Sequence, residues 1–321
     1  MAAIVDRHVA DALRRATTTF PQERILQQPF IARALDHEMI AFGEVHGIRE
    51  APRLFCQVAR VLAERASTVL VLLERDFLAQ DAVSRFVDGE TIDLDAVLHF
   101  SGDPRNAGEL AGPRDFIHAL RHLNTNSRCA FSIACIDIAH NPDDYPEAIS
   151  GADPRIAVSR DTLAIRDEDI FDAAREQFMF QEAAKAIERS PADRILFCGG
   201  NGHVCLSSSY FDRDGTPELH IPTLVGRIAR DLHRRTHAVH FLPVSGRTRY
   251  QQAGQLRLKS LPPIKQDPVF STLASIDRQA GWMSYTDLSA LPASLTTLAL
   301  HRQSWQGILT LSAVSPDEGV R

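Results

Sequence analysis

Several carboxylates and histidines follow short apolar runs, at points where a strand would end. They are Glu44 with His46, Glu74, Asp137 with His140, and His203. A carboxylate can orient an imidazole, which then takes a proton from water. Alternatively, carboxylates and imidazoles can bind a metal ion that lowers the pKa of its bound water. These residue types therefore indicate hydrolytic chemistry by one of two routes.

The segment from Met39 to Glu50 joins one of these apolar runs to a polar turn. Pro52 follows, where the first turn of a helix tolerates proline, and apolar residues recur at helical spacing from Arg53 to Arg65. The polar turn is thus predicted between the carboxyl end of a strand and a helix N-terminus, where open α/β sheets bind ligands. For this segment alone, a hydrogen-bonded turn with a surface histidine is the alternative.

A glycine-rich run, Gly199 to Gly202, precedes His203. Its backbone N–H groups are candidates for holding a developing oxyanion or a phosphate. The run lacks the G-x-G-x-x-G spacing of a dinucleotide site, and the chain has no G-x-S-x-G motif that would indicate a serine nucleophile. Structural roles remain the alternative for Glu74, as the partner of an arginine, and for Asp137 and His140.

Strand and helix patterns alternate along the chain, which is typical of a parallel sheet flanked by helices. Continuous apolar runs predict strands at 39–42, 68–73, 129–136, 194–198 and 238–242. Amphipathic spacing predicts helices at 4–16, 23–37, 53–65, 79–100, 114–124, 165–189 and 222–235. The fold class is therefore α/β, with a central, largely parallel sheet. We expect helical insertions in the two long intervals between strands to form a lid over its carboxyl edge.

The 321 residues are enough for one large core. We predict a single α/β domain over 1–321, in which residues 1–38 form a helical lead-in. Residues 246–321 are predicted to be a C-terminal extension of the same domain, with short strands at 256–261 and 307–314.

The net charge of −6 gives no general attraction to nucleic acid or to an anionic membrane. No apolar run is long enough to span a membrane, and the first residues lack the apolar region of a secretory signal. Five cysteines without paired metal-type spacing suit reduced thiols. We therefore expect a cytoplasmic protein with a small-molecule substrate, although export without a cleaved signal peptide stays open. The sequence does not predict the oligomeric state.

The motifs together resemble those of erythromycin-esterase-like proteins and of the related ChaN-like and TraB/Tiki groups. The resemblance covers about Ile40 to Ser245, in order. Its motifs are Phe42-Gly43-Glu44-Val45-His46-Gly47-Ile48-Arg49-Glu50, Leu72-Leu73-Glu74, Ser84-Arg85-Phe86-Val87-Asp88-Gly89, Arg175 to Met179, and Phe197 to Val204.

The resemblance implies an α/β fold in which the first-motif histidine, His46, is the base that activates water without a metal. Glu44 and Glu74 match the surrounding carboxylates, and His203 matches the distal histidine. The remaining site residues are expected to contact substrate: Arg49, Glu50, Asp137, His140, Gly200 and Asn201.

The favoured interpretation is a hydrolase that cleaves an ester or related bond with a His/Glu cleft and no cofactor. A metal-dependent hydrolase or peptidase of the TraB/Tiki type is the first alternative, in which a divalent metal would be bound. The second is a haem-binding, ligand-binding or effector protein on the same scaffold.

Overall fold

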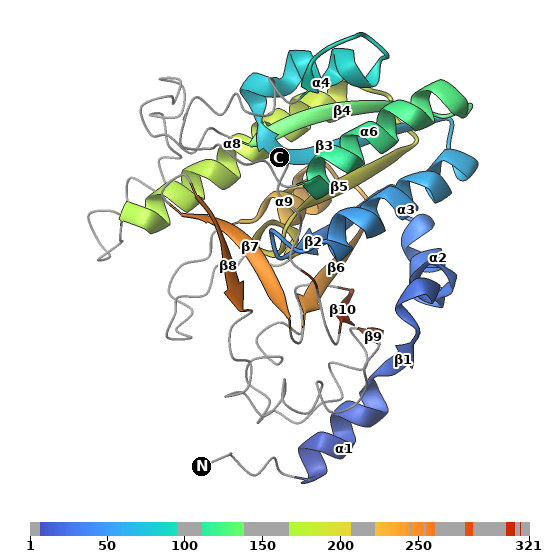
Figure 1. Cartoon of the computed structure of the whole chain (residues 1–321), viewed down its shortest axis with the longest axis vertical. Helices are drawn as coiled ribbons and strands as arrows, with labels where there is room; N and C mark the ends of the chain where they lie inside the picture. Colours follow the sequence, from blue (N-terminus) through green and yellow to red (C-terminus); the bar gives the residue numbers. More distant parts are fainter. Residues whose placement is uncertain are drawn as a thin grey trace.

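An eight-stranded sheet forms the centre of the computed structural model, which describes residues 7–94, 111–137, 167–206, 222–243, 246–252, 255–260, 280–284, 306–311 and 315. In pairing order its strands are β1 (Thr18–Phe20), β9 (Ala280–Ser284), β10 (Gly307–Leu311), β6 (Thr236–Pro243), β2 (Met39–Glu44), β5 (Arg194–Gly200), β3 (Thr68–Asp76) and β4 (Ala130–Asp137) (Figure 1). Every pair from β10 to β4 is parallel, whereas β9 is antiparallel to both of its neighbours. The predicted α/β class with a largely parallel sheet is confirmed.

Helices cover both faces of this sheet (Figure 1). One apolar cluster joins the sheet to α2 (Pro29–Leu35), α3 (Glu50–Arg65), α4 (Gln80–Val87) and α6 (Ala111–Asn126). The other joins it to α1 (Arg7–Ala16), α8 (Asp167–Arg189) and α9 (Leu224–Asp231). On β2, Ile40 and Phe42 pack in the first cluster, and Met39 and Ala41 in the second. Burial on both faces explains why the central strands are continuously apolar.

The predicted helix at 23–37 is wrong as a single element, because it consists of a 3₁₀ helix, η1 (Gln22–Gln27), followed by α2. Proline disfavours helical backbone in the residue before it, and Gln28 has an extended conformation with φ −77° and ψ 143°. The predicted helix at 79–100 is also wrong as a single element, because helix α4 stops within it. It ends at Val87, and Gly89 follows with φ +102°.

The chain's ends contain strands that the sequence patterns did not predict. Both β1 and β9 were missed, as was β7 (Arg247–Gln252), which pairs with β8 (Gln255–Ser260) in a separate two-stranded sheet. These segments are short or polar, so they lack a clear alternation of apolar and polar residues that would predict a strand. Strands β9 and β10 from residues 246–321 belong to the same sheet as β1 from residues 1–38.

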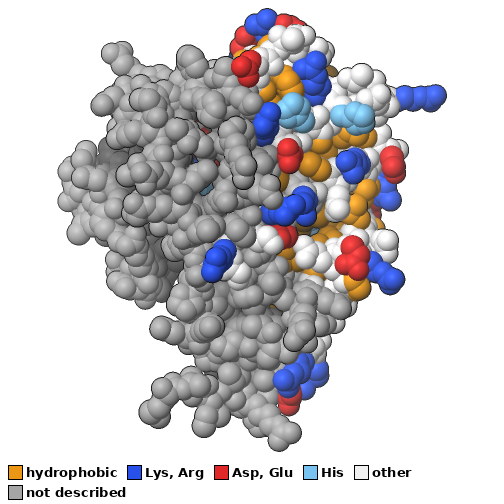
Figure 2. All heavy atoms as spheres, viewed as in Figure 1, with side chains coloured by type: hydrophobic (Ala, Val, Ile, Leu, Met, Phe, Trp, Pro, Cys, Tyr) orange, Lys and Arg blue, Asp and Glu red, His pale blue; other side chains and the backbone are white. Residues whose placement is uncertain are grey.

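The helices described from the two long intervals, α4, α6 and α8, pack on the faces of the sheet. Residues 95–110 and 138–166 of these intervals lie outside the described residues, as do residues 4–6 of the predicted first helix. The lid over the carboxyl edge therefore stays a prediction. On the face shown in Figure 2, acidic and basic side chains of the described residues are interspersed.

Strand β4 is the outermost of the described strands on its side of the sheet rather than a central one. Two side-chain amides take the place of a neighbouring strand. Asn124 donates to the Phe131 carbonyl (2.9 Å) and accepts from the Phe131 N–H (2.6 Å). Gln80 donates to the Ile133 carbonyl (2.9 Å) and accepts from the Cys135 N–H (2.6 Å). This pairing satisfies backbone groups of an edge that would otherwise be open to another chain.

We predict that Asn124→Ala lowers the free energy of unfolding by about 1–3 kcal/mol, because it leaves the backbone groups of Phe131 without a partner. Urea unfolding would measure the change. The matched control is Asn126→Ala on the same helix, because the Asn126 side chain bonds within its own helix, to His122. Equal stability changes in the two variants would contradict the proposed role of Asn124.

Candidate active site

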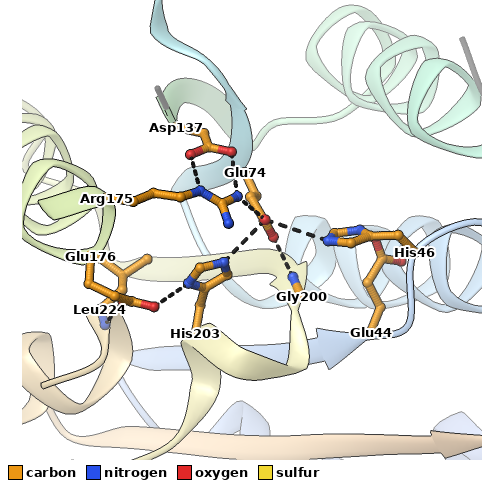
Figure 3. Close-up of polar contacts among 9 residues, drawn as sticks. All are labelled: Glu44, His46, Glu74, Asp137, Arg175, Glu176, Gly200, His203 and Leu224. Atoms are coloured by element: carbon orange, nitrogen blue, oxygen red, sulfur yellow. Dashed lines mark hydrogen bonds and ion pairs between the residues drawn. The ribbon is translucent and has the colours of Figure 1, made fainter. Parts of the chain in front are cut away.

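Glu74, at the end of β3, is the carboxylate on which the predicted residues converge (Figure 3). Its Oε1 accepts hydrogen bonds from the Arg175 guanidinium at 2.5 Å and from His203 Nε2 at 3.1 Å. The same oxygen lies 3.5 Å from His46 Nε2. Its Oε2 accepts the Gly200 N–H at 2.5 Å. One buried carboxylate thus joins β3, β5, α8 and the turn after β2.

Arg175, on α8, links Glu74 to Asp137 at the end of β4. Its Nε donates to Asp137 Oδ1 at 2.8 Å, and a terminal nitrogen donates to Oδ2 at 2.6 Å. Burial alone would lower the pKa of Arg175, but Asp137 and then Glu74 outweigh it and raise that pKa. Arg175 therefore remains a fixed positive charge between two carboxylates.

His203, in the 3₁₀ helix η5 (Asn201–Val204), lies between two buried carboxylates. Its Nε2 faces Glu74, and its Nδ1 lies 2.5 Å from Glu176 Oε1. The second oxygen of Glu176 accepts the N–H of Leu224, the first residue of α9, at 2.6 Å. The chain of contacts in Figure 3 therefore runs from the N-terminus of α9 through Glu176 and His203 to Glu74.

His46 lies in the turn after β2, which Gly47 closes with φ +80°. Its Nδ1 lies 3.1 Å from Glu44 Oε1, and its Nε2 faces Glu74. The His46 side chain is 58% exposed, against 11% for Glu44, 6% for Glu74 and 5% for His203. Of the four predicted catalytic residues, His46 thus has the most exposed side chain.

The charges of this cluster are coupled. Burial alone would raise the pKa of Glu74, but His203 and then His46 outweigh it and hold that pKa well below its usual value. Burial would lower the pKa of His203, but Glu74 and then Glu176 raise it to about 10. Glu74 also raises the pKa of His46 well above its usual value, and Glu44 adds to this effect. Together they outweigh desolvation by the surrounding protein, which alone would lower that pKa. The pKa of His203 therefore lies above neutral pH, and the pKa of His46 is raised in the same direction.

In the glycine-rich run, the Gly200 N–H is bonded within the protein. Gly199 and Gly200 belong to β5, and the Gly200 N–H is donated to Glu74 rather than left for a ligand. A Cβ at Gly199 would lie 2.7 Å from Glu74 Oε2, and one at Gly200 would lie 3.0 Å from His46 Nε2. The missing side chains therefore allow Glu74 and His46 to approach the strand closely.

The other predicted substrate-binding residues are placed as follows. The Asn201 side chain donates to the Phe241 carbonyl (2.8 Å) and accepts its N–H (3.0 Å), which ties η5 to β6. The Glu50 carboxylate accepts the Ser315 N–H at 3.0 and 3.1 Å, and the Arg49 N–H donates to the Ser315 carbonyl at 3.0 Å. Both contacts fasten the first motif to a segment near the end of the chain. His140 lies outside the described residues.

Two residues of the cluster were not predicted as site residues. Arg175 was recognised only as part of a motif, and Glu176 was not singled out at all. A signal for Glu176 exists in the sequence: it precedes Met179 by three positions and Ala183 by seven, on the buried stripe of α8. A carboxylate on such a stripe requires a buried partner.

All five cysteines are free thiols. Burial, and then Glu44, raises the pKa of Cys198 well above its usual value, so the thiol on β5 is not a thiolate nucleophile. Among the described residues, no three His, Cys, Asp or Glu side chains are placed to hold a metal ion. None of the helices in that part of the chain is long and apolar enough to cross a membrane.

No protein-family model and no curated protein matches the sequence. Solved structures do match. A Bacillus cereus protein has a TM-score of 0.68 at 13% identity, over 98% of this chain and 99% of its own. A succinoglycan biosynthesis protein has a TM-score of 0.68 at 11% identity, over 98% of both chains. A mutant of the erythromycin esterase EreC in its open conformation has a TM-score of 0.59 at 11% identity, over 94% of this chain and 98% of its own.

The chain has the erythromycin-esterase-like fold. The expected resemblance is therefore confirmed for the fold. At these identities the likeness extends to the fold alone, and the roles of the site residues depend on their geometry.

The raised pKa of His203 predicts how stability depends on pH. Its ion pairs stabilise the folded protein fully below the unfolded pKa of about 6.5, and this stabilisation is lost as pH rises through about 10. We therefore expect the free energy of unfolding to fall more steeply over this range in the wild type than in His203→Gln. Urea unfolding across pH 6–10 measures how the free energy of unfolding depends on pH, with His122→Gln on the exposed face of α6 as control. Parallel curves for wild type and His203→Gln would contradict the prediction.

Proposed function

We propose that the protein is a hydrolase that activates water with His46 to cleave an ester or related bond. The observation that carries this proposal is that the exposed His46 side chain lies next to the buried carboxylate of Glu74. Its side chain is 58% exposed, while the carboxylate of Glu74 behind it is 6% exposed. A substrate entering from solvent can therefore meet the imidazole, and the attacking water would have to approach Nε2 beside its 3.5 Å contact with Glu74 Oε1.

In this mechanism the reacting form is neutral His46, with its proton on Nδ1 donated to Glu44 and its lone pair on Nε2. A water molecule attacks the ester carbonyl carbon as Nε2 takes one of its protons. The proton then passes to the alcohol oxygen as the bond between carbon and that oxygen breaks. The products are a carboxylic acid and an alcohol, and His46 is neutral again.

Glu74 supports this cycle as a fixed negative charge. Both of its oxygens already accept hydrogen bonds, from Arg175, His203 and Gly200, so it is poorly placed to take a proton itself. It is well placed to stabilise the imidazolium that forms 3.5 Å away when water is deprotonated. The same attraction raises the pKa of His46, so we expect the base to act at pH values near or above this raised pKa.

The erythromycin esterase with the same fold supports an ester as the reacting bond, and the substrate of this chain is not specified further. We also propose that no metal or other cofactor is required. In support, the Nδ1 and Nε2 atoms of His46 and His203 all face carboxylates, so a cation would have to displace these contacts.

The test is to screen p-nitrophenyl esters and lactones, and then to compare wild type with His46→Asn on the best substrate. Loss of the base should reduce kcat by about 10²–10⁴. The matched control is His122→Asn, which changes an exposed histidine on α6 and should keep full activity.

Three outcomes would contradict the proposal. Retained activity in His46→Asn would refute the base. Loss of wild-type activity with a chelator, restored by a divalent cation, would indicate the metal-dependent alternative. An absorbance band on haem addition, with no ester cleaved, would favour a binding protein.

A further inference from the structure

Glu176 is a buried carboxylate with both oxygens occupied and with no part in the mechanism above. Its exposure is 1%. One oxygen meets His203 Nδ1 at 2.5 Å, and the other accepts the Leu224 N–H at 2.6 Å. Burying a carboxylate without compensation is costly, and here an imidazolium and a helix N-terminus both compensate it. A purely apolar contact between α8 and α9 would have avoided this cost.

The position of Glu176 connects it to His46 through two intervening side chains. His203 points its other nitrogen at Glu74 Oε1, which is the oxygen that also faces His46. Because Glu176 accepts at Nδ1 and Glu74 accepts at Nε2, both ring nitrogens of His203 carry protons. The ring therefore presents a full positive charge to Glu74, opposite the side on which His46 lies.

We propose that Glu176 is a positioning residue of the site, which keeps His203 charged and thereby limits how strongly Glu74 attracts a proton at His46. This inference rests on the proposed role of His46 as the base. The charged groups involved are Glu44 and Glu74 around His46, Glu74 and Glu176 around His203, and Arg175 beside Glu74.

The substitution Glu176→Gln removes the negative charge at position 176 and keeps nearly the same side-chain shape. A glutamine in the same place can turn its carbonyl oxygen to the Leu224 N–H and donate its amide N–H to Nδ1. His203 would then be neutral, with its one proton on Nε2 still donated to Glu74. The contacts are kept while the negative charge of residue 176 and the positive charge of His203 are both removed. The positive charge is the nearer of the two to Glu74, because His203 contacts Glu74 directly, so Glu74 attracts the proton of His46 more strongly in the variant.

The experiment is a pH titration of both imidazoles by two-dimensional ¹H–¹⁵N NMR in protein labelled at histidine. In Glu176→Gln we expect His203 to be neutral at pH 8 and the pKa of His46 to be higher than in wild type. A rise of one unit would reduce the neutral fraction of His46 about tenfold at lower pH, and kcat/KM by the same factor. The control is Glu182→Gln, a carboxylate of α8 that pairs with Lys185 at 2.5 Å and should change neither titration.

Two results would overturn the inference. One is a folded Glu176→Gln protein in which His203 stays doubly protonated or the titration of His46 is unchanged. The other needs no variant: His203 of the wild type titrating near pH 6.5, as a free imidazole does. Neither readout needs a substrate, so the inference is decided even if the ester screen fails. If the NMR result holds while His46→Asn keeps its activity, only the proposed function fails.

Discussion

The structure depends on the burial of one carboxylate, Glu74, among groups that must all stay charged. Removing one member of a buried ion pair typically costs about 3–5 kcal/mol, because the partner is left without compensation. Here the partners lie on separate elements, Arg175 on α8 and His203 in η5, and a backbone N–H of β5 completes the set. The cluster therefore fixes the relative positions of helix and sheet at the carboxyl edge as well as the chemistry of the site.

That constraint explains the unusual features of the surrounding sequence. Glycines at 199 and 200 leave room for Glu74, because a Cβ would lie 2.7 Å from its Oε2 at position 199 and 3.3 Å from it at position 200. Parallel strands that end at one edge bring together Glu44, Glu74 and Asp137, which are distant in the chain. Within this arrangement the charged groups around Glu74 are buried, whereas the His46 side chain is 58% exposed.

The sequence predicted the strands that carry the site because each is a continuous apolar run with a polar residue at its end. It therefore also predicted that Glu44, His46, Glu74 and His203 follow strand ends, although not which atoms meet. Glu176 was missed because a carboxylate within an amphipathic helix resembles one of its solvent-facing residues until its position on the apolar stripe is counted. The Glu50 contact with Ser315 joins residues 265 positions apart, which no local pattern can reveal. The break at Pro29 was predictable from the restriction on the residue before it, and the helix prediction overlooked it.

The central claim is that His46 is the accessible reacting group of a buried ionic cluster. Carbethoxylation by diethyl pyrocarbonate tests it most directly, because the reagent modifies neutral imidazoles that solvent reaches. Peptide mass spectrometry would follow each histidine while activity on the best ester is assayed in parallel. We expect activity to be lost in step with modification of His46, at a rate that rises with pH through a pKa above 6.5, while His203 stays unmodified. Full modification of His46 with activity retained would contradict the account.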